Sequence, residues 1–323
     1  MRSSYAVGVD VGGTRIAVGL VERKGRVVKD AKRLTPKTGP FAVVDTIIDL
    51  VEEVSAGAHQ SEIAGIGIGL PAQVDFLRQS VEFCTNLPLA GVDVRSLVMS
   101  RSKLDVTIDN DGHMAAIGES RYGAAKGVKD FLMITVGTGV GGGLFLDGAP
   151  YRGSRGLGGE IGHIVVKLDG DPCPCGGTGH LESYVSRPAI AAHGRKAAER
   201  PSGSEIRTAA GGNIEAITAE SVLLAARAGD APAREILLEC GDTLGRALVS
   251  CVNMLNPKLI VIGGGIGEAA DFMVQRAAEV MQAEALAGRR DVSVVQAVLG
   301  NDAGILGAAA LAFDEYDAHT GMH

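Results

Sequence analysis

A short motif occurs twice in the chain, and this repetition limits the folds that the sequence can adopt. The segment Val9–Thr14 (VDVGGT) is similar to Ile134–Gly139 (ITVGTG), about 125 residues later. In both places an apolar, β-branched run breaks at glycine and threonine and then resumes, which is the pattern of a β-hairpin with a glycine turn. A repeated unit of this kind predicts two related α/β halves, each presenting a glycine hairpin.

The rest of the chain alternates between strand-like and helix-like segments, which is typical of the α/β class. Strands are expected at 5–11, 16–21, 63–70, 106–108, 131–136, 143–146, 258–262 and 292–298, and helices at 41–54, 112–120, 181–200, 219–228, 231–255, about 269–287 and about 304–313. Pro40 can stand in the first turn of its helix, and Pro188 can start or kink another.

The chain has 323 residues, enough for about two domains. Its formal net charge is −7, which argues against general nucleic-acid binding, since that requires a basic face. No run of 18 apolar residues predicts a membrane span, and the first residues do not have the pattern of a signal peptide. Five cysteines, an odd number, fit a reducing compartment, so we expect a cytoplasmic protein.

Three glycine-rich loops follow predicted strands: Asp10–Arg15, Gly137–Gly143 and Gly263–Gly265. Glycines let backbone N–H groups approach phosphate oxygens, and Thr14 adds a hydroxyl donor. Asp10 could hold Mg²⁺ through water. Each loop could also be an ordinary turn, with Arg15 simply exposed on its hairpin. The three together favour nucleotide binding, although the G-x-x-x-x-G-K-[ST] loop is missing.

Asn110 and Asp111 stand at the carboxyl end of a predicted strand, where α/β folds place their sites. A carboxylate there can accept the proton of an attacking hydroxyl group. The alternative is a helix N-cap, which Asp and Asn both favour.

Two thiols and two imidazoles lie close together in the sequence at His163, Cys173, Cys175 and His180, flanked by Glu160 and Glu182. This set suits a structural, tetrahedral Zn²⁺ with no open position. The alternative is a pair of reduced loop cysteines beside two surface histidines. The other cysteines are expected in the core and the other histidines at the surface; these residues are Cys84, Cys240, Cys251, His59, His113, His193, His319 and His323.

Taken in order, the motifs resemble those of the ROK family of sugar kinases (repressor, open reading frame, kinase), and most of all its bacterial glucokinases. The segments that carry the resemblance span almost the whole chain: Val9–Thr14, Gly69–Pro71, Asn86–Pro88, Asn110-Asp111, Gly137–Gly143, Gly159–His163, Cys173–Glu182, Asn256-Pro257 and Gly263–Gly265. Two positions depart from the family pattern: His180 stands at the usual third zinc cysteine, and Ala72 follows Pro71 where glycine is common.

The resemblance implies a duplicated actin-like ATPase fold (ribonuclease H-like), with two α/β domains flanking a cleft. The small domain would hold residues 1–110 and the C-terminal helix at about 303–323. The large domain would hold residues 111–302, with the zinc loop and the helices that form a dimer. A homodimer or homotetramer is therefore expected.

The resemblance also implies ATP-dependent phosphorylation of a hexose, with glucose giving glucose 6-phosphate and Asp111 as the general base. The implied sugar-binding residues are Asn86, Asn110, Asp111, Glu160, His163 and Glu182. The implied ATP and Mg²⁺ residues are Asp10, Gly12, Gly13, Thr14, Arg15, Gly137, Thr138, Gly139, Gly263, Gly264 and Gly265. The implied structural zinc ligands are His163, Cys173 and Cys175, with His180 as the fourth.

Several alternatives remain at this point. The sugar could be mannose, fructose or an N-acetylhexosamine, and polyphosphate could replace ATP. A sugar-sensing repressor of the same family would carry an N-terminal helix-turn-helix, whereas here the glycine hairpin begins near residue 8, so we expect an enzyme. An actin-like ATPase without a sugar is disfavoured by Glu160, His163 and Glu182.

Overall fold

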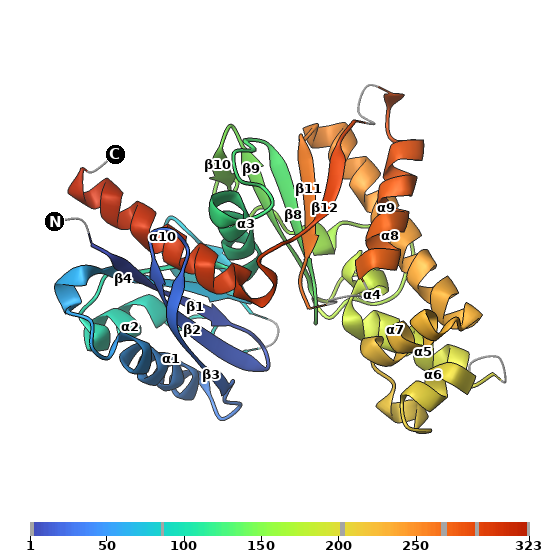
Figure 1. Ribbon diagram of the computed structural model, residues 1–323, viewed down its shortest axis with the longest axis horizontal. Helices are drawn as coiled ribbons and strands as arrows, with labels where there is room; N and C mark the ends of the chain where they lie inside the picture. The colour runs from blue at the N-terminus through green and yellow to red at the C-terminus, as the bar shows by residue number, and fades with distance from the viewer. Residues whose placement is uncertain (1–2, 85–86, 201–203, 266–269, 288–290, 322–323) are drawn as a thin grey trace. The chain divides into compact units, whose positions relative to one another are not determined.

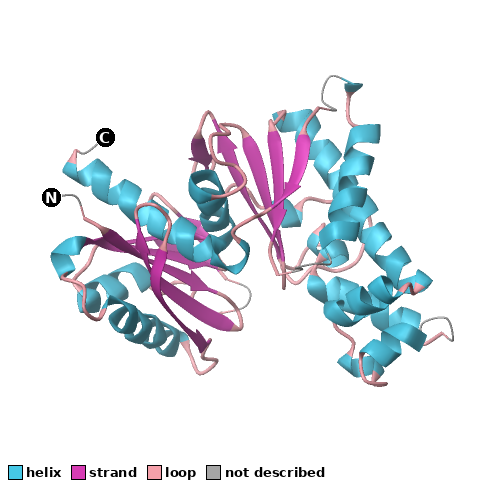
Figure 2. Ribbon diagram, viewed as in Figure 1, coloured by secondary structure: helices cyan, strands magenta, loops and turns pink. Residues whose placement is uncertain are grey.

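The computed structural model describes residues 3–84, 87–200, 204–265, 270–287 and 291–321. Its first sheet has the strand order β3-β2-β1-β4-β7 (Figures 1 and 2). The strands are β1 (Tyr5–Val11), β2 (Arg15–Glu22), β3 (Val27–Leu34), β4 (Ile63–Leu70) and β7 (Val106–Asn110). β1 and β2 form the predicted antiparallel hairpin, and β1, β4 and β7 run parallel. A separate ribbon pairs β5 (Gln73–Asp75) with β6 (Ser80–Phe83).

Helices cover both faces of this sheet (Figure 1). They are α1 (Pro40–Ser55), α2 (Val94–Ser102), α3 (Asp111–Tyr122) and α10 (Ala303–Thr320). α1 begins at Pro40, as predicted, and its buried valines and isoleucines join the strand side chains in one core. On the opposite face α10 approaches so closely that a Cβ on Gly8 would lie 1.9 Å from the Ile305 carbonyl oxygen, and a Cβ on Gly67 would lie 1.9 Å from that of Ala308. Glycine at these two positions lets the helix pack against bare backbone.

The second sheet repeats the strand order of the first, as β10-β9-β8-β11-β12. Its strands are β8 (Phe131–Val136), β9 (Val140–Leu146), β10 (Ala149–Tyr151), β11 (Leu259–Gly263) and β12 (Ser293–Gln296). β10 is antiparallel to β9, whereas β8, β11 and β12 run parallel. The equal order of the two sheets confirms the predicted duplication of an α/β unit.

The remaining helices follow β10 in the chain and are shown in yellow to orange in Figure 1. They are α4 (Glu182–Val185), α5 (Arg187–Ala198), α6 (Ser204–Ala209), α7 (Ala219–Ala228), α8 (Ala231–Leu255) and α9 (Ala270–Glu284). Short 3₁₀ turns occupy Gln60–Glu62, Ile161–His163, Ile214–Ala216 and Gly300–Asp302. None of the helices among the described residues combines the length and the apolar character that a membrane span requires.

The chain divides into two compact units. The first unit contains Met1–Lys129, Gly143–Gly159 and Asn301–His323, and the second contains Asp130–Gly142 and Glu160–Gly300. The sequence-based domain division at residues 110 and 303 stays a prediction.

Candidate functional site

In the first unit, three parallel strands bring polar residues from distant parts of the sequence to one edge of the sheet. Asp10 on β1 pairs with Gly69 on β4, and Gly69 pairs with Asp109 on β7. Asn110 ends β7, and Asp111 begins α3 directly after it. Since ligands of α/β folds bind outside the carboxyl ends of parallel strands, this edge is the place where a reaction centre is expected.

The glycine turn between β1 and β2 is held by the segment that follows β3. The Gly12 N–H donates to the Arg15 carbonyl oxygen at 2.8 Å, which closes the turn. The Thr35 hydroxyl donates to the Gly12 carbonyl at 2.7 Å, and Lys37 Nζ donates to the Gly13 carbonyl at 2.6 Å. Lys37 therefore adds a cation to a turn proposed to meet phosphate. Sequence reasoning missed it, because nothing local distinguishes it from the other lysines.

Asp10 lies at the end of β1 in a partly buried position. Burial raises the pKa of its carboxyl group to about 6. Among the described residues no side chain or backbone group forms a hydrogen bond or ion pair with this carboxyl. A carboxylate without a protein cation beside it suits a hydrated Mg²⁺, which prefers oxygen ligands.

Asn110 is the N-cap of α3. Its Oδ1 accepts from the N–H groups of Gly112 at 2.8 Å and His113 at 3.2 Å, and its Nδ2 donates to the Ala72 carbonyl at 3.1 Å. The capping interpretation thus holds for Asn110. Asp111 is the first residue of the helix and is partly exposed. A carboxylate at that position can reach a ligand at the sheet edge.

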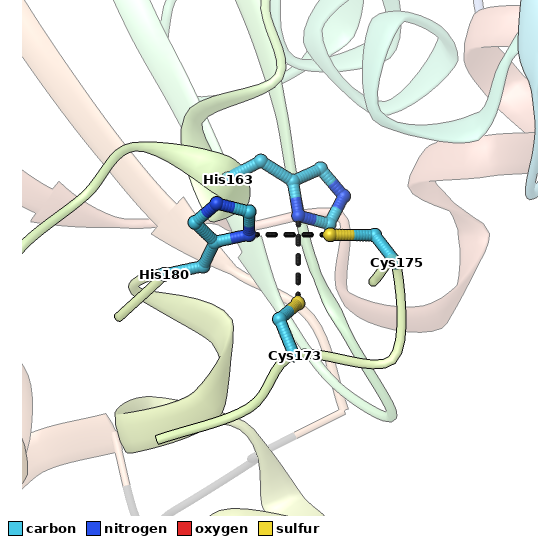
Figure 3. Close-up of side chains that lie close together, drawn as sticks. All are labelled: His163, Cys173, Cys175 and His180. Atoms are coloured by element: carbon cyan, nitrogen blue, oxygen red, sulfur yellow. Dashed lines mark hydrogen bonds between the residues drawn. The ribbon is translucent and has the colours of Figure 1, made fainter. Parts of the chain in front are cut away.

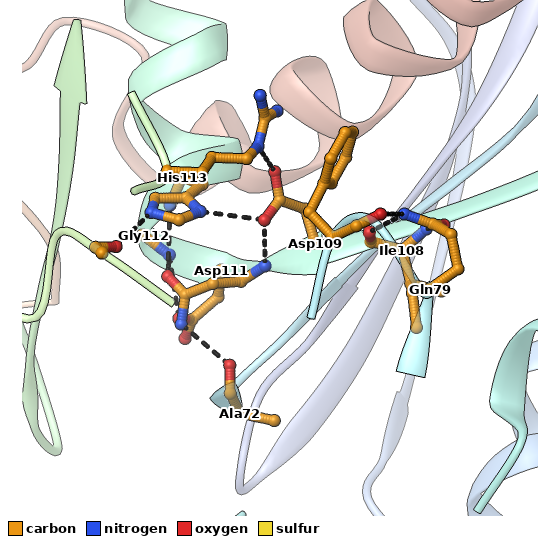
Figure 4. Close-up of polar contacts among 11 residues, drawn as sticks. Ala72, Gln79, Ile108, Asp109, Asp111, Gly112 and His113 are labelled. Carbon is orange, nitrogen blue, oxygen red and sulfur yellow. Dashed lines mark hydrogen bonds and ion pairs between the residues drawn. The ribbon is translucent and has the colours of Figure 1, made fainter. Parts of the chain in front are cut away.

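A buried ionic cluster includes residues on both sides of Asp111 in the chain, Asp109 before it and His113 after it (Figure 4). Asp109 Oδ1 accepts from the Asn110 N–H and from His113 Nδ1, both at 2.8 Å, and Oδ2 accepts from Arg152 Nε at 2.7 Å. His113 Nε2 lies 2.8 Å from the Gly158 carbonyl oxygen. The expectation that His113 is a surface residue is wrong, since it is only 3% exposed. It lies in the first turn of a helix that is buried on almost all sides, so periodicity could not mark it.

Burial and charge act in opposite directions on this cluster. Burial alone would raise the pKa of Asp109, but the hydrogen bonds and charges of His113 and Arg152 hold it below its usual value. Burial alone would lower the pKa of His113, but Asp109 and the Gly158 carbonyl raise it. Both shifts favour the charged forms.

In the second unit, the two cysteines and two histidines meet as predicted (Figure 3). Their ligand atoms all lie within 4.8 Å of one another. Cys173 Sγ is 3.8 Å from His163 Nδ1, and Cys175 Sγ is 3.2 Å from His180 Nδ1. A tetrahedral zinc ion with Zn–N of about 2.0 Å and Zn–S of about 2.3 Å separates neighbouring ligand atoms by about 3.3–3.8 Å. The donor set and the spacing fit Zn²⁺.

The two glutamates of the zinc loop lie beside this cluster. Glu160 Oε2 is 3.9 Å from His163 Nε2, on the ring nitrogen that faces away from Cys173. This distance is too long for a direct hydrogen bond between the two groups, so the carboxylate lies near the ring without orienting it directly. Glu182 Oε2 accepts from the Val140 N–H at 2.8 Å. A Cβ on Gly139 would lie 2.4 Å from the same oxygen, so a larger residue at this position would clash with the Glu182 carboxylate.

The two remaining glycine loops also lie together in the second unit. The Gly137 N–H donates to the Gly139 carbonyl at 2.8 Å, and the Arg187 N–H donates to the Gly137 carbonyl at 2.9 Å. β11 pairs with β8, so Gly263 lies opposite Thr135. Gly264 has a φ of +99°, and a Cβ there would lie 2.4 Å from the Val136 carbonyl oxygen. The turn at 137–139 and the loop at 263–265 therefore offer one surface of bare backbone.

The predicted site residues thus fall into two groups. Asp10, Gly12, Gly13, Thr14, Arg15, Asn110 and Asp111 lie in the first unit, and Gly137, Thr138, Gly139, Glu160, His163, Cys173, Cys175, His180, Glu182, Gly263, Gly264 and Gly265 lie in the second. Asn86, a predicted sugar-binding residue, lies outside the described residues.

Comparison with known proteins identifies the family. The sequence model of the ROK family matches residues 6–315. The chain belongs to the ROK family. It is 35% identical to a glucokinase of Halalkalibacterium halodurans over 316 residues, 96% of each chain. It is 34% identical to a glucokinase of Streptomyces coelicolor over 95% of this chain and 96% of that protein.

The solved structures agree with this assignment. A ROK family glucokinase from Streptomyces griseus, in complex with glucose and AMPPNP, matches with a TM-score of 0.86 and 32% identity, over 95% of this chain and 98% of that one. Among the sequence relatives there is also a xylose repressor of Caldicellulosiruptor bescii, which is 29% identical over 96% of this chain and 80% of the repressor.

These comparisons confirm two predictions. The fold is the duplicated actin-like ATPase fold, and the enzyme class is that of a sugar kinase.

Proposed function

We propose that this chain transfers the γ-phosphoryl group of ATP to glucose and forms glucose 6-phosphate. The observation that carries this proposal is the position of Asp111. In a chain similar to glucokinases over nearly its whole length, it begins α3 at the carboxyl edge of the first sheet, in the same edge region as Asp10.

The reaction needs a proton acceptor, because a sugar hydroxyl is a poor nucleophile. The Asp111 carboxylate accepts this proton while the oxygen attacks the γ-phosphorus in line with the leaving ADP. A Mg²⁺ ion held through Asp10 would neutralise charge on the phosphates. At the turn that the Gly12 N–H closes, the N–H groups of Gly13 and Thr14 and the Thr14 hydroxyl, with Lys37 beside them, would donate to phosphate oxygens.

The sugar is held by carboxylates that the zinc loop positions. Glu160 and Glu182 can accept hydrogen bonds from sugar hydroxyls, and His163 links Glu160 to the cysteine cluster. The four ligands leave a bound Zn²⁺ no open position, so its role would be to hold the loop in shape. Asn86 and Asn110 complete the proposed sugar-binding set.

The test measures the sugar phosphate formed from a panel of sugars, with ATP or polyphosphate as the phosphoryl donor, and also the release of ADP where ATP is the donor. We expect ADP release that depends on glucose, with smaller kcat/KM for mannose, fructose and N-acetylhexosamines. A higher kcat/KM for one of these sugars than for glucose would identify that sugar as the preferred substrate. A rate that no sugar changes would contradict the kinase proposal.

We also propose that the chain is a homodimer or homotetramer. Apolar side chains stay exposed on α8, where Leu238 and Met254 are 42% and 76% accessible. Light scattering coupled to gel filtration tests this, and a monomer at micromolar concentration would contradict it.

A further inference from the structure

The carboxylate of Asp109 holds both ends of one loop. The loop is Arg152–Gly158, and its ends are joined to each other, since the Gly158 N–H donates to the Arg152 carbonyl at 2.8 Å. Arg152 reaches Asp109 directly through Nε at 2.7 Å. Gly158 reaches it through His113, whose ring contacts Asp109 on one side and the Gly158 carbonyl on the other, each at 2.8 Å. The loop therefore closes on a single buried carboxylate.

The hydrogen-bond partners of His113 determine its protonation state. Asp109 is ionised, because it accepts from the Asn110 N–H and from Arg152 as well as from the ring. The carbonyl oxygen of Gly158 can only accept. Both ring nitrogens of His113 must then carry a proton, which makes it a buried imidazolium. The raised pKa of His113 agrees with this assignment.

This arrangement is costly for the fold. Two cations, His113 and Arg152, surround one carboxylate, and Arg152 Nη2 is buried without a hydrogen-bond partner among the described residues. The Arg152 guanidinium lies over the Phe76 ring at 3.9 Å, which offsets part of the cost. Buried charges of this kind contribute little net stability. A positioning role beside Asp111 would account for this cost.

We propose that Asp109, His113 and Arg152 form a positioning network that fixes the backbone of Asp111 and the loop leading to Glu160. Asp109 holds the N–H of Asn110, just before Asp111, and also His113, in the turn just after it. The peptide groups of Asp111 are thus fixed from both sides. The same network holds Gly158, two residues before Glu160 in the chain. The kinetic consequences rest on the proposed function, whereas the protonation state and the order of the loop do not.

The network should depend on pH in one direction. The charged groups that face His113 are Asp109 on β7 and Arg152 after β10, and its other neighbour is the uncharged Gly158 carbonyl. A neutral imidazole has one N–H and can satisfy only one of its two acceptors. When pH rises through the pKa of His113, either Asp109 or Gly158 loses its bond, so kcat should fall on the alkaline side.

Two variants separate the two bonds of His113. In His113→Asn the amide nitrogen takes the place of Nδ1 and keeps the bond to Asp109. In His113→Gln it takes the place of Nε2 and keeps the bond to Gly158. Neither side chain titrates. We expect kcat to fall about ten-fold or more in both, as when groups that orient site residues are removed, with KM for ATP little changed and without the alkaline fall of the wild type.

The control is Arg155→Gln, in the same loop. Arg155 is 57% exposed and lies 3.8 Å from Asp75 and 3.9 Å from Glu82, away from Asp109. The kcat and the pH profile of the Arg155→Gln variant should match those of the wild type. Hydrogen exchange should show faster exchange across 152–158 in His113→Asn than in His113→Gln or in the control.

A measurement on the wild-type protein covers the case in which the variants do not fold. Nitrogen NMR of the His113 ring should show two protonated nitrogens at pH 7. A single protonated nitrogen overturns the proposal, as do His113 variants with wild-type kcat and pH profile. If no sugar gives phosphoryl transfer, the proposed function fails, but the NMR and exchange results still decide whether the network exists as described.

Discussion

Asp10 and Asp109 occupy the same row of the first sheet, each opposite Gly69 on the strand between them. Their surroundings differ. Asp109 accepts three hydrogen bonds, two of them from cationic side chains, and its pKa is lowered. Burial raises the pKa of Asp10 to about 6. The charge of Asp109 is therefore already neutralised by cationic side chains of the protein, whereas Asp10 is left for a cation that binds from solution.

The first prediction follows from the burial of Asp10. Its pKa in the folded protein, about 6, lies above the ordinary value of 3.8 for an aspartate. Folding therefore favours the protonated form, and the cost of ionisation grows as pH rises from about 4 and is complete above about 6. Asp10→Asn removes this cost, so it should abolish activity yet raise the free energy of unfolding at pH 8 by up to about 3 kcal/mol. Urea unfolding of the wild type and of Asp10→Asn at pH 8 and at pH 4 measures this change in free energy. An equal change at both pH values would contradict the prediction.

The second prediction concerns Asp111. Asp111→Asn keeps the size of the side chain and removes its basicity, so kcat should fall about 10²- to 10⁴-fold, as expected for a general base. Glucose affinity, measured by calorimetry, should change little. The control is Asp314→Asn, which removes an exposed ion pair with Arg121 in the same unit and should keep its kcat. A near-normal rate for Asp111→Asn would show that another group takes the proton.

The third prediction tests the metal cluster. Cys175→Ala removes one of four ligands, so zinc content should drop from about one ion per chain toward zero, and the melting temperature should fall. Cys251→Ala removes a buried thiol from α8, far along the chain from the cluster, and should keep the zinc. Elemental analysis of both variants decides the matter. Equal metal content in Cys175→Ala and the wild type would remove the zinc interpretation.

The fourth prediction concerns His180, the histidine of the expected zinc ligand set that stands where the resemblance led us to expect a cysteine. Its Nδ1 points to Cys175 Sγ at 3.2 Å, as a ligand would. His180→Cys should therefore keep the zinc, because thiolate and imidazole are both good ligands, whereas His180→Ala should lose it. Zinc retained in His180→Ala would mean that three residues bind the ion without His180.

Local patterns in the sequence were enough for part of this structure. The glycine repeat predicted two related α/β halves, which the two sheets of equal strand order confirm. The close spacing of Cys173, Cys175 and His180 predicted their cluster. The network behind Asp111 could not be found in the same way. Arg152 lies 43 residues after Asp109 in a loop with no motif, and its bond to Asp109 depends on how the chain folds back after β10. The burial of His113 likewise results from packing on all sides of α3 rather than from helical periodicity.

The fifth prediction separates two glycines of one turn. A Cβ on Gly139 would lie 2.4 Å from Glu182 Oε2, whereas a Cβ on Gly137 would meet nothing closer than the Gly265 nitrogen at 3.9 Å. Gly139→Ala should therefore displace the Glu182 carboxylate and break its bond with the Val140 N–H. Because charge-assisted hydrogen bonds contribute about 1.5–3 kcal/mol, KM for glucose should rise about ten-fold or more. Gly137→Ala should leave KM for glucose near the wild-type value. Equal glucose KM values for the two variants would show that Glu182 does not hold the sugar.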